Sequence, residues 1–226
     1  MTLQFFGHSA FLIELDGKKL LFDPFIKGNP VNSDLDLKSI TADYVLLTHG
    51  HGDHTGDTLE IIQNCGARLI SNYEIFNHFN AFGIHGYGLN IGGELKLDFC
   101  TIKLVTAVHS SSLPDGSYGG NPVGFVIWNS ESCFYVSGDT ALTLDMKLIP
   151  MTCPTLNFAI LCIGDLFTMG YKDAAIAADF IQCKKIIGCH YDTFPPIVID
   201  KEKVLHYFQT KDLELILPRI GEVIDI

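Results

Sequence analysis

The 226-residue sequence lacks any apolar run that approaches the roughly 18 residues needed to cross a bilayer. Its longest apolar stretch, residues 157–163, has the length of a buried strand. The first 15 residues carry no basic leader, and Gly7, His8, Ser9 and Glu14 interrupt their apolar pattern, which is not typical of a signal peptide. We therefore expect a cytoplasmic protein that has no membrane partner.

Cysteines in metal-binding or disulfide-type spacing are also missing. The count of seven is odd, and no pair has the CxxC spacing. Cys100, Cys133 and Cys162 lie within apolar runs, where a free cysteine behaves as a small hydrophobic residue. The cysteines are therefore expected to be reduced thiols, as in a cytoplasmic protein.

Basic residues are scarce, with 15 Lys and Arg against 26 Asp and Glu, a net charge of −11. A nucleic-acid surface needs clustered positive charge, so we expect a small-molecule substrate and no nucleic-acid partner. At 47% hydrophobic residues, the chain can bury a sizeable core, which excludes a disordered protein. No linker, repeat or composition shift divides it, so a single domain over residues 1–226 is expected, and a homo-oligomer is compatible with the sequence.

Apolar patterning predicts an α/β fold. Residues 1–23 alternate as a short β-meander, and residues 24–41 are typical of an irregular loop. Later strands are expected at 44–47, 67–70, 86–108, 123–128, 133–136, 158–163, 185–188 and 213–217. Helices are expected at 58–65, 72–82, 143–149, 172–183 and 201–208. Runs of strands followed by alternating strands and helices indicate packed sheets with helices on their outer faces.

The most informative motif is the His-rich sequence 48–54, directly after the apolar strand 44–47. It places His49, His51, Asp53 and His54 within six residues, a concentrated set of metal ligands. Two glycines allow a tight loop from which these side chains can converge. Four ligands on one short loop cannot all satisfy a single tetrahedral ion, so the site is expected to draw further ligands from elsewhere.

Three more candidate ligands follow apolar strands: His109, Asp139 and His190. Polar residues at the carboxyl ends of strands are where α/β proteins build their sites. Asp23 is the best candidate to orient an imidazole, although an acid that starts a turn before Pro24 fits equally well. His8 either approaches the site or is a turn residue.

These motifs resemble the metallo-β-lactamase superfamily, and within it the small metal-dependent hydrolases related to ascorbate-6-phosphate lactonase. The motifs that carry the resemblance are GHSAFLI (7–13), DPF (23–25), GNP (28–30), THGHGDH (48–54), HSSS (109–112), GNPVGFVI (120–127), GDT (138–140), FTMG (167–170) and HYDTFPPI (190–197). They occur in the family's order and cover nearly the whole chain.

The resemblance implies a four-layer αββα sandwich with two divalent metal ions. Carried over by position, His49, His51 and His109 hold the first ion, Asp53, His54 and His190 hold the second, and Asp139 bridges them. A hydroxide shared by the ions would then cleave a small ester, lactone or phosphoester, with Asp53 as a catalytic residue. Zinc suits this imidazole-rich set, and manganese or iron are alternatives.

Two departures from the family pattern leave the substrate open. The chain has Gly164-Asp165-Leu166 where a Gly-Gly-Asn-like turn is expected, and residues 141–144 after the GDT motif contain no glycine. The polar loops 24–40 and 110–122 are the expected walls of the substrate site. A nuclease or phosphodiesterase of the same fold, and a non-catalytic metal-stabilised scaffold that binds a metabolite, are the alternative functions.

Overall fold

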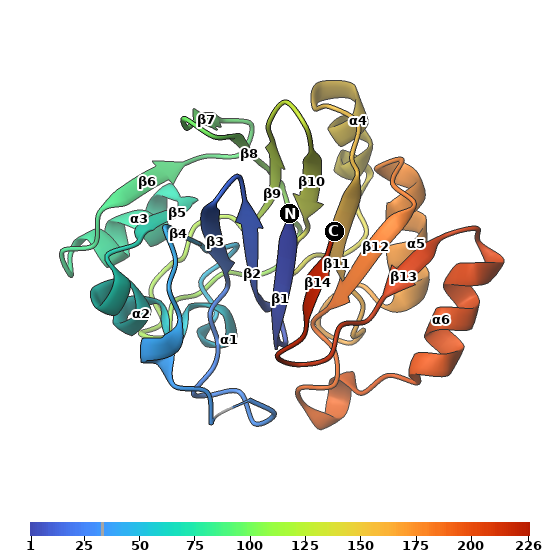
Figure 1. Ribbon diagram of the computed structural model, residues 1–226, viewed down its shortest axis with the longest axis horizontal. Helices are drawn as coiled ribbons and strands as arrows, with labels where there is room; N and C mark the ends of the chain where they lie inside the picture. The colour runs from blue at the N-terminus through green and yellow to red at the C-terminus, as the bar shows by residue number, and fades with distance from the viewer. Residues whose placement is uncertain (33) are drawn as a thin grey trace. The chain divides into compact units, whose positions relative to one another are not determined.

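Two seven-stranded mixed sheets, one in each of two units, make up the computed structural model (Figure 1). The structure describes residues 1–32 and 34–226. The first unit comprises residues 1–90, 110–122 and 219–226, and the second unit comprises residues 91–109 and 123–218.

The sheet of the first unit has the order β14-β1-β2-β3-β4-β5-β6. Its strands are β1 (Thr2–Gly7), β2 (Ala10–Leu15), β3 (Lys18–Phe22), β4 (Tyr44–Leu46), β5 (Arg68–Asn72), β6 (Gly86–Leu89) and β14 (Val223–Asp225). The strands from β14 to β3 pair antiparallel, and those from β3 to β6 pair parallel. Because β1, β3 and β4 run in the same direction, the segments that follow them leave the sheet at one edge.

Helices α2 (Thr58–Cys65) and α3 (Tyr73–Asn80) bury their apolar residues in the core of the first unit. Ile61 of α2 and Ile75 of α3 belong to the same buried cluster as Val45 of β4 and Leu69 of β5. Helix α2 ends at Gly66, whose φ of 74° is left-handed and suits glycine. Two short helices complete the unit: the 3₁₀ turn η1 (Leu37–Ser39) and α1 (Gly52–Thr55).

The sheet of the second unit has the order β13-β12-β11-β10-β9-β8-β7. Its strands are β7 (Glu94–Lys96), β8 (Thr101–Thr106), β9 (Val123–Trp128), β10 (Cys133–Val136), β11 (Phe158–Cys162), β12 (Lys185–Cys189) and β13 (Glu214–Ile216). The pairs from β7 to β10 are antiparallel, and those from β10 to β13 are parallel. Strands β8, β10, β11 and β12 therefore all end at one edge of this sheet.

Helices α5 (Tyr171–Phe180) and α6 (Lys201–Thr210) pack against strands β11 and β13, respectively (Figure 1). The buried face of α5 consists of small residues, including Ala174 and Ala178, which allow a close approach to the sheet. The unit also contains η2 (Leu144–Leu148), α4 (Ile149–Thr152) and η3 (Pro195–Ile197).

Most of the elements expected from the sequence are confirmed, with differences at the ends of some of them. Residues 143–149 form a 3₁₀ turn and then α4, and the loop 24–41 includes η1. Strand β14 is not apparent from the sequence, because it has only three residues. In the described part of the chain, no helix is both long and apolar enough to span a membrane.

Candidate metal centre

The His-rich motif leaves the edge of the first sheet directly after β4. His49 and His54 are buried, and His51 and Asp53 are partly exposed. The sequence predicts a loop here, and the structure instead places Gly52–Thr55 in the short helix α1. Asp53 lies in the first turn of that helix, where a carboxylate interacts favourably with the backbone N–H groups.

Asp23 follows β3 and organises the motif from the adjacent strand. The backbone N–H of Thr48 donates to Asp23 Oδ1 at 2.8 Å, and the Thr48 hydroxyl donates to Oδ2 at 2.7 Å. His54 Nδ1 lies 2.9 Å from Asp23 Oδ2. Because an ionised carboxylate only accepts hydrogen bonds, His54 carries its proton on Nδ1 and its lone pair on Nε2. The prediction that Asp23 orients an imidazole is confirmed.

The ring of His49 is oriented through Thr48. The Thr48 hydroxyl uses its proton on Asp23, so it accepts a hydrogen bond from His49 Nδ1 at 3.0 Å. The lone pair of His49 is then on Nε2, which lies 3.0 Å from Nδ1 of His51. Two imidazole nitrogens bound to one zinc ion at about 2.0–2.1 Å lie roughly 3.3 Å apart, so this pair fits a shared metal ion.

His8 contributes more to this region than the sequence indicated. It lies just after β1 with φ of 56°, a conformation uncommon for non-glycine residues. Its Nε2 is 3.3 Å from Asp53 Oδ2, and its ring is edge-on to that of His54 with centroids 5.3 Å apart. His8 therefore contacts two of the predicted ligands. Its position between Gly7 and Ser9, at a strand end, was the only signal in the sequence.

Asp57 is a supporting residue that sequence reasoning missed. Its side chain accepts hydrogen bonds from the backbone N–H groups of Ile26, at 2.5 Å, and Lys27, at 2.9 Å. This anchors the start of the 24–40 loop and holds Phe25 beside His8, with ring centroids 5.8 Å apart. The signal available was an acidic residue immediately before helix α2, which is ordinarily read as a helix cap.

The serines after His109 hold the His-rich loop in place. Ser111 Oγ accepts a hydrogen bond from the N–H of Gly50 at 3.1 Å, and Ser110 Oγ lies 3.2 Å from His51 Nε2. Gly50 also approaches the backbone of Ser112 so closely that a side chain would crowd it. Ser110 and Ser111 thus contact the ligand-bearing loop through their hydroxyl groups.

In the second unit, Asp139 lies between two imidazoles. Its Oδ2 is 3.0 Å from His190 Nε2 and 3.7 Å from His109 Nε2. The three residues follow β10, β12 and β8, which end at the same edge of the second sheet. Asp139 and His190 are both 2% exposed, and His190 has φ of 57°. Asp139 thus lies beside both of the other predicted ligands of this unit.

The predicted donor atoms thus form two groups, one in each unit. The first unit brings together His49, His51, Asp53 and His54, and the second unit brings together His109, Asp139 and His190. The donors are imidazole and carboxylate groups, which suit zinc and other first-row divalent ions.

The cysteines take no part in either group, and none of the seven, all of them among the described residues, forms a disulfide bond. Burial raises the pKa of the thiols of Cys100 and Cys133 to about 12, and that of Cys162 and Cys183 to about 11. Since the thiolate is the form that binds metal and attacks electrophiles, these thiols are inert at neutral pH.

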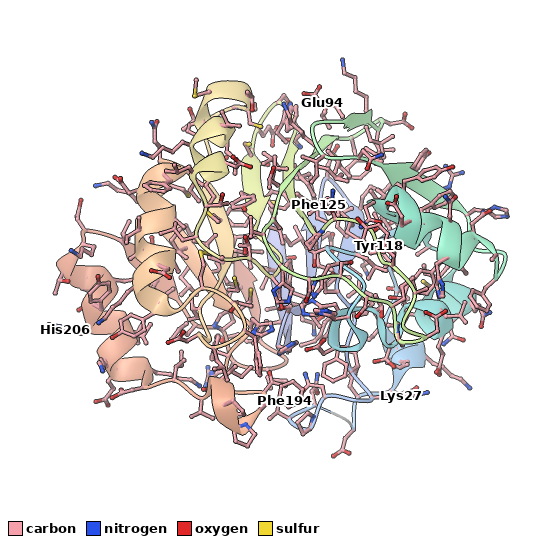
Figure 2. All side chains as sticks on the ribbon, turned by 180° about the vertical axis from the view of Figure 1, so that it is seen from behind. Lys27, Glu94, Tyr118, Phe125, Phe194 and His206 are labelled. Carbon is pink, nitrogen blue, oxygen red and sulfur yellow. The ribbon has the colours of Figure 1, made fainter. Side chains whose placement is uncertain are left out.

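The remaining histidines lie outside these groups, as the sequence predicts. His206 is exposed on α6, at the outer margin of the second unit (Figure 2). His85 is exposed before β6, and His78 is half-buried against the rings of Phe79 and Phe82.

The metal-ligand groups and the mixed sheets agree with comparisons to known proteins. The family model described as the beta-lactamase superfamily domain matches residues 2–190. A UPF0173 metal-dependent hydrolase of Flavobacterium johnsoniae is 48% identical over 100% of both chains, and one of Christiangramia forsetii is also 48% identical over 100% of both. The chain therefore belongs to the UPF0173 family of metal-dependent hydrolases, within the β-lactamase superfamily.

Solved structures show the same fold. Igni18, a metallo hydrolase from the archaeon Ignicoccus hospitalis, is 34% identical with a TM-score of 0.89, covering 99% of this chain and 97% of its own. An isothiocyanate hydrolase from Delia radicum gut bacteria is 18% identical with a TM-score of 0.79, covering 100% of this chain and 99% of its own, which indicates a shared fold. The expected metallo-β-lactamase fold is confirmed.

Proposed function

We propose that this metal-dependent hydrolase binds two divalent ions and cleaves a small ester, lactone or phosphoester. His49, His51 and His109 would hold one ion, Asp53, His54 and His190 the other, and Asp139 both. The observation that carries the proposal is the carboxylate of Asp139 between two imidazoles, 3.0 and 3.7 Å away. Two neighbouring divalent ions need a shared anionic ligand that offsets their positive charge.

Bound divalent ions supply Lewis acidity and lower the pKa of coordinated water toward neutrality. The chain's own residues then have defined tasks. Asp23 and Thr48 fix the proton positions on His54 and His49, so that the lone pairs needed for metal binding are available.

Asp53 is the proposed catalytic residue. Its side chain is 34% exposed, whereas His8, which contacts it at 3.3 Å, is buried. Because the Asp53 carboxylate is partly open to solvent, it can accept a proton from the attacking water. The contact with His8 holds the carboxylate in position. His8 is therefore a positioning residue in this mechanism.

Zinc is the proposed metal, because five of the seven donors are imidazoles and none is a thiolate. Elemental analysis of protein purified without chelator or an affinity metal tests both the number and the identity of the ions. We expect close to two zinc ions per chain. A value near zero that persists after incubation with zinc, manganese and iron salts would contradict the proposal.

The role of Asp53 is tested separately by Asp53→Asn, which keeps the shape and removes the proton acceptor. With an aryl ester, a lactone and bis(p-nitrophenyl) phosphate as substrates, we expect turnover to fall by at least a hundredfold. Asp98→Asn is the matched control, because Asp98 is exposed in the turn between β7 and β8. An Asp53→Asn protein with unchanged metal content and unchanged turnover would show that Asp53 is not the proton acceptor.

A further inference from the structure

Three chain segments of the second unit are joined by hydrogen bonds around Thr140, the residue after Asp139. The N–H of Val108 donates to Thr140 Oγ1, and the N–H of Ala141 donates to the carbonyl of Val108, both at 2.9 Å. The N–H of Met169 donates to the carbonyl of Thr140, also at 2.9 Å. The segments after β8, β10 and β11 are therefore held beside the Asp139 carboxylate.

The segments joined around Thr140 carry exposed apolar side chains. Val108 is 49% exposed, Leu166 66% and Phe167 54%. We call these three residues the apolar rim. Single exposed apolar residues are ordinary on a protein surface, but a group of them beside a reactive centre indicates a binding surface.

The backbone of the rim is held in an unfavourable conformation. Asp165 and Leu166 have φ of 64° and 55°, and a leucine in the left-handed region costs free energy that the surrounding structure must offset. The bridge between Gly164 and Gly170 and the hydrogen bond from Asp165 N–H to the Met169 carbonyl, at 3.1 Å, hold the turn closed. Gly164 can carry no side chain, because a Cβ would lie 2.0 Å from the His190 carbonyl oxygen. The turn that presents Leu166 is thus fixed against the backbone of a metal ligand.

The ligand-bearing segments contain no positive charge. Residues 48–57, 107–112, 138–144, 163–170 and 189–199 include neither Lys nor Arg. Sites that recognise a phosphate group usually use these residues to pair with its oxygens. Lys185, the nearest basic residue in sequence to His190, lies at the opposite end of β12, and Lys201 is paired with the Asp192 carboxylate, with Nζ and Oδ2 3.0 Å apart.

We propose that the apolar rim binds an apolar acyl or alkyl group of the substrate, so that the substrate is an ester or lactone with an aliphatic chain. This inference rests on the proposed hydrolase function and narrows its substrate class. Val108, Leu166 and Phe167 would contact the chain, and the scissile carbonyl would lie at the metal ligands beside them.

The test compares kcat/KM for p-nitrophenyl hexanoate and p-nitrophenyl acetate, which share a leaving group. Each buried methylene is worth about a factor of four in affinity, so we expect the wild type to prefer the hexanoate. In Leu166→Asn/Phe167→Ser, that preference is expected to fall about tenfold. Asparagine tolerates the left-handed backbone at position 166, which favours an intact turn.

Met151→Ala is the matched control. Met151 is 76% exposed on α4, which precedes β11, whereas Leu166 and Phe167 follow β11 and Val108 follows β8. This variant is expected to keep the wild-type preference. A binding measurement adds a readout independent of turnover: calorimetric titration with hexanoate is expected to show affinity reduced about tenfold in the double variant, with acetate binding unchanged.

The outcomes separate this inference from the proposed function. If the wild type cleaves bis(p-nitrophenyl) phosphate but neither ester, or if the double variant keeps the hexanoate preference, the rim does not bind an acyl chain and the hydrolase function stands. If the metal-loaded wild type cleaves none of the substrates, the proposed function itself fails. Equal metal content and circular dichroism in all variants show that the site and fold are retained.

Discussion

At the scale of single residues, Asp23 determines how two of the metal ligands are protonated. Its carboxylate accepts three hydrogen bonds in a buried position, from the backbone and hydroxyl of Thr48 and from His54 Nδ1. Removing one partner from such a network leaves buried donors unsatisfied, which costs more than the net gain of each bond. Asp23 would therefore influence a bound metal ion through His54 and His49, without contacting the ion itself.

We therefore predict that Asp23→Asn weakens zinc affinity by about ten- to hundredfold, because His54 and Thr48 lose their charged acceptor. The measurement is competition for zinc with a chromophoric chelator. Asp16→Asn is the control, since Asp16 lies in the exposed turn between β2 and β3 and asparagine tolerates its φ of 51°. Equal zinc affinity in the Asp23 variant and the wild type would contradict this role.

The sequence indicates the candidate ligands more clearly than the residues that support them, for a physical reason. A concentrated set of metal-ligating side chains is rare by chance, so the motif from His49 to His54 stands out from the sequence. Asp57 and His8 act through contacts with residues distant in sequence, such as Ile26 and Asp53. Each occupies an ordinary local position, Asp57 at the start of a helix and His8 in a turn, so only the tertiary structure shows its further contacts.

At the scale of elements, Asn72 joins helix α3 to the loop 110–122. Its Oδ1 accepts a hydrogen bond from the N–H of Ile75 at 2.9 Å, which caps the helix. Its Nδ2 donates to the carbonyls of Gly119 and Asn121, at 2.7 and 3.0 Å. One buried side chain thus fixes both a helix end and the loop that carries the serines beside His51.

We predict that Asn72→Ala lowers the free energy of unfolding by about 2–3 kcal/mol, because it removes the cap and leaves one buried and one partly buried carbonyl without their donor. Urea unfolding followed by circular dichroism measures the change. Asn77→Ala, at an exposed position of the same helix, is expected to change stability by less than about 0.5 kcal/mol. A similar effect for both substitutions would mean that the cap contributes little.

Asp43, the residue before β4, has a carboxylate that makes the free energy of unfolding depend on pH. Partial burial raises the pKa of Asp43, but hydrogen bonds from the Lys19 N–H and the Lys18 ammonium outweigh it, so the pKa lies below its usual value of 3.8. The folded state binds this proton less readily than the unfolded state does. The stabilisation is therefore present above the usual pKa and is lost as the pH falls through the lower folded value.

Asp43→Asn is accordingly expected to reduce stability at pH 7 by about 0.5–1 kcal/mol, a small effect because the pair is partly exposed. The difference from the wild type should persist at pH 5 and shrink below pH 3.8. Urea titrations of both proteins over this range provide the measurement. A difference that is independent of pH would show that the charge of Asp43 is not involved.

The elements also show where sequence patterns are insufficient. Strands β4, β11 and β12 were predictable, because buried parallel strands are continuous apolar runs. Helix α1 was not, since Gly52–Thr55 is only about one turn of polar and small residues, and its conformation depends on the Asp23 and serine contacts around it. The three residues of β14 have too short a pattern to distinguish a strand from a loop.

At the scale of the whole molecule, metal ions are expected to stabilise the fold, because they bind the assembled ligands and not the unfolded chain. An ion at a hundred times its dissociation constant adds about 2.7 kcal/mol, which corresponds to roughly 5–10 °C in Tm for a chain of this size. We predict a decrease of that order on treatment with a chelator, measured by calorimetry. Tm should recover with added zinc in proportion to the logarithm of its free concentration, and a Tm unaffected by either would contradict metal binding.

The pairing of β1 with β14 has a consequence for how the molecule is made. Strand β1 leaves the ribosome first among the strands of its sheet, whereas its partner Val223–Asp225 is translated only after the entire second unit. Until then, the outer backbone N–H and C=O groups of Thr2–Gln4 have no strand to bind. An unpaired strand edge can associate with other chains. Slow translation of the second unit would therefore prolong the period in which nascent chains are prone to aggregate.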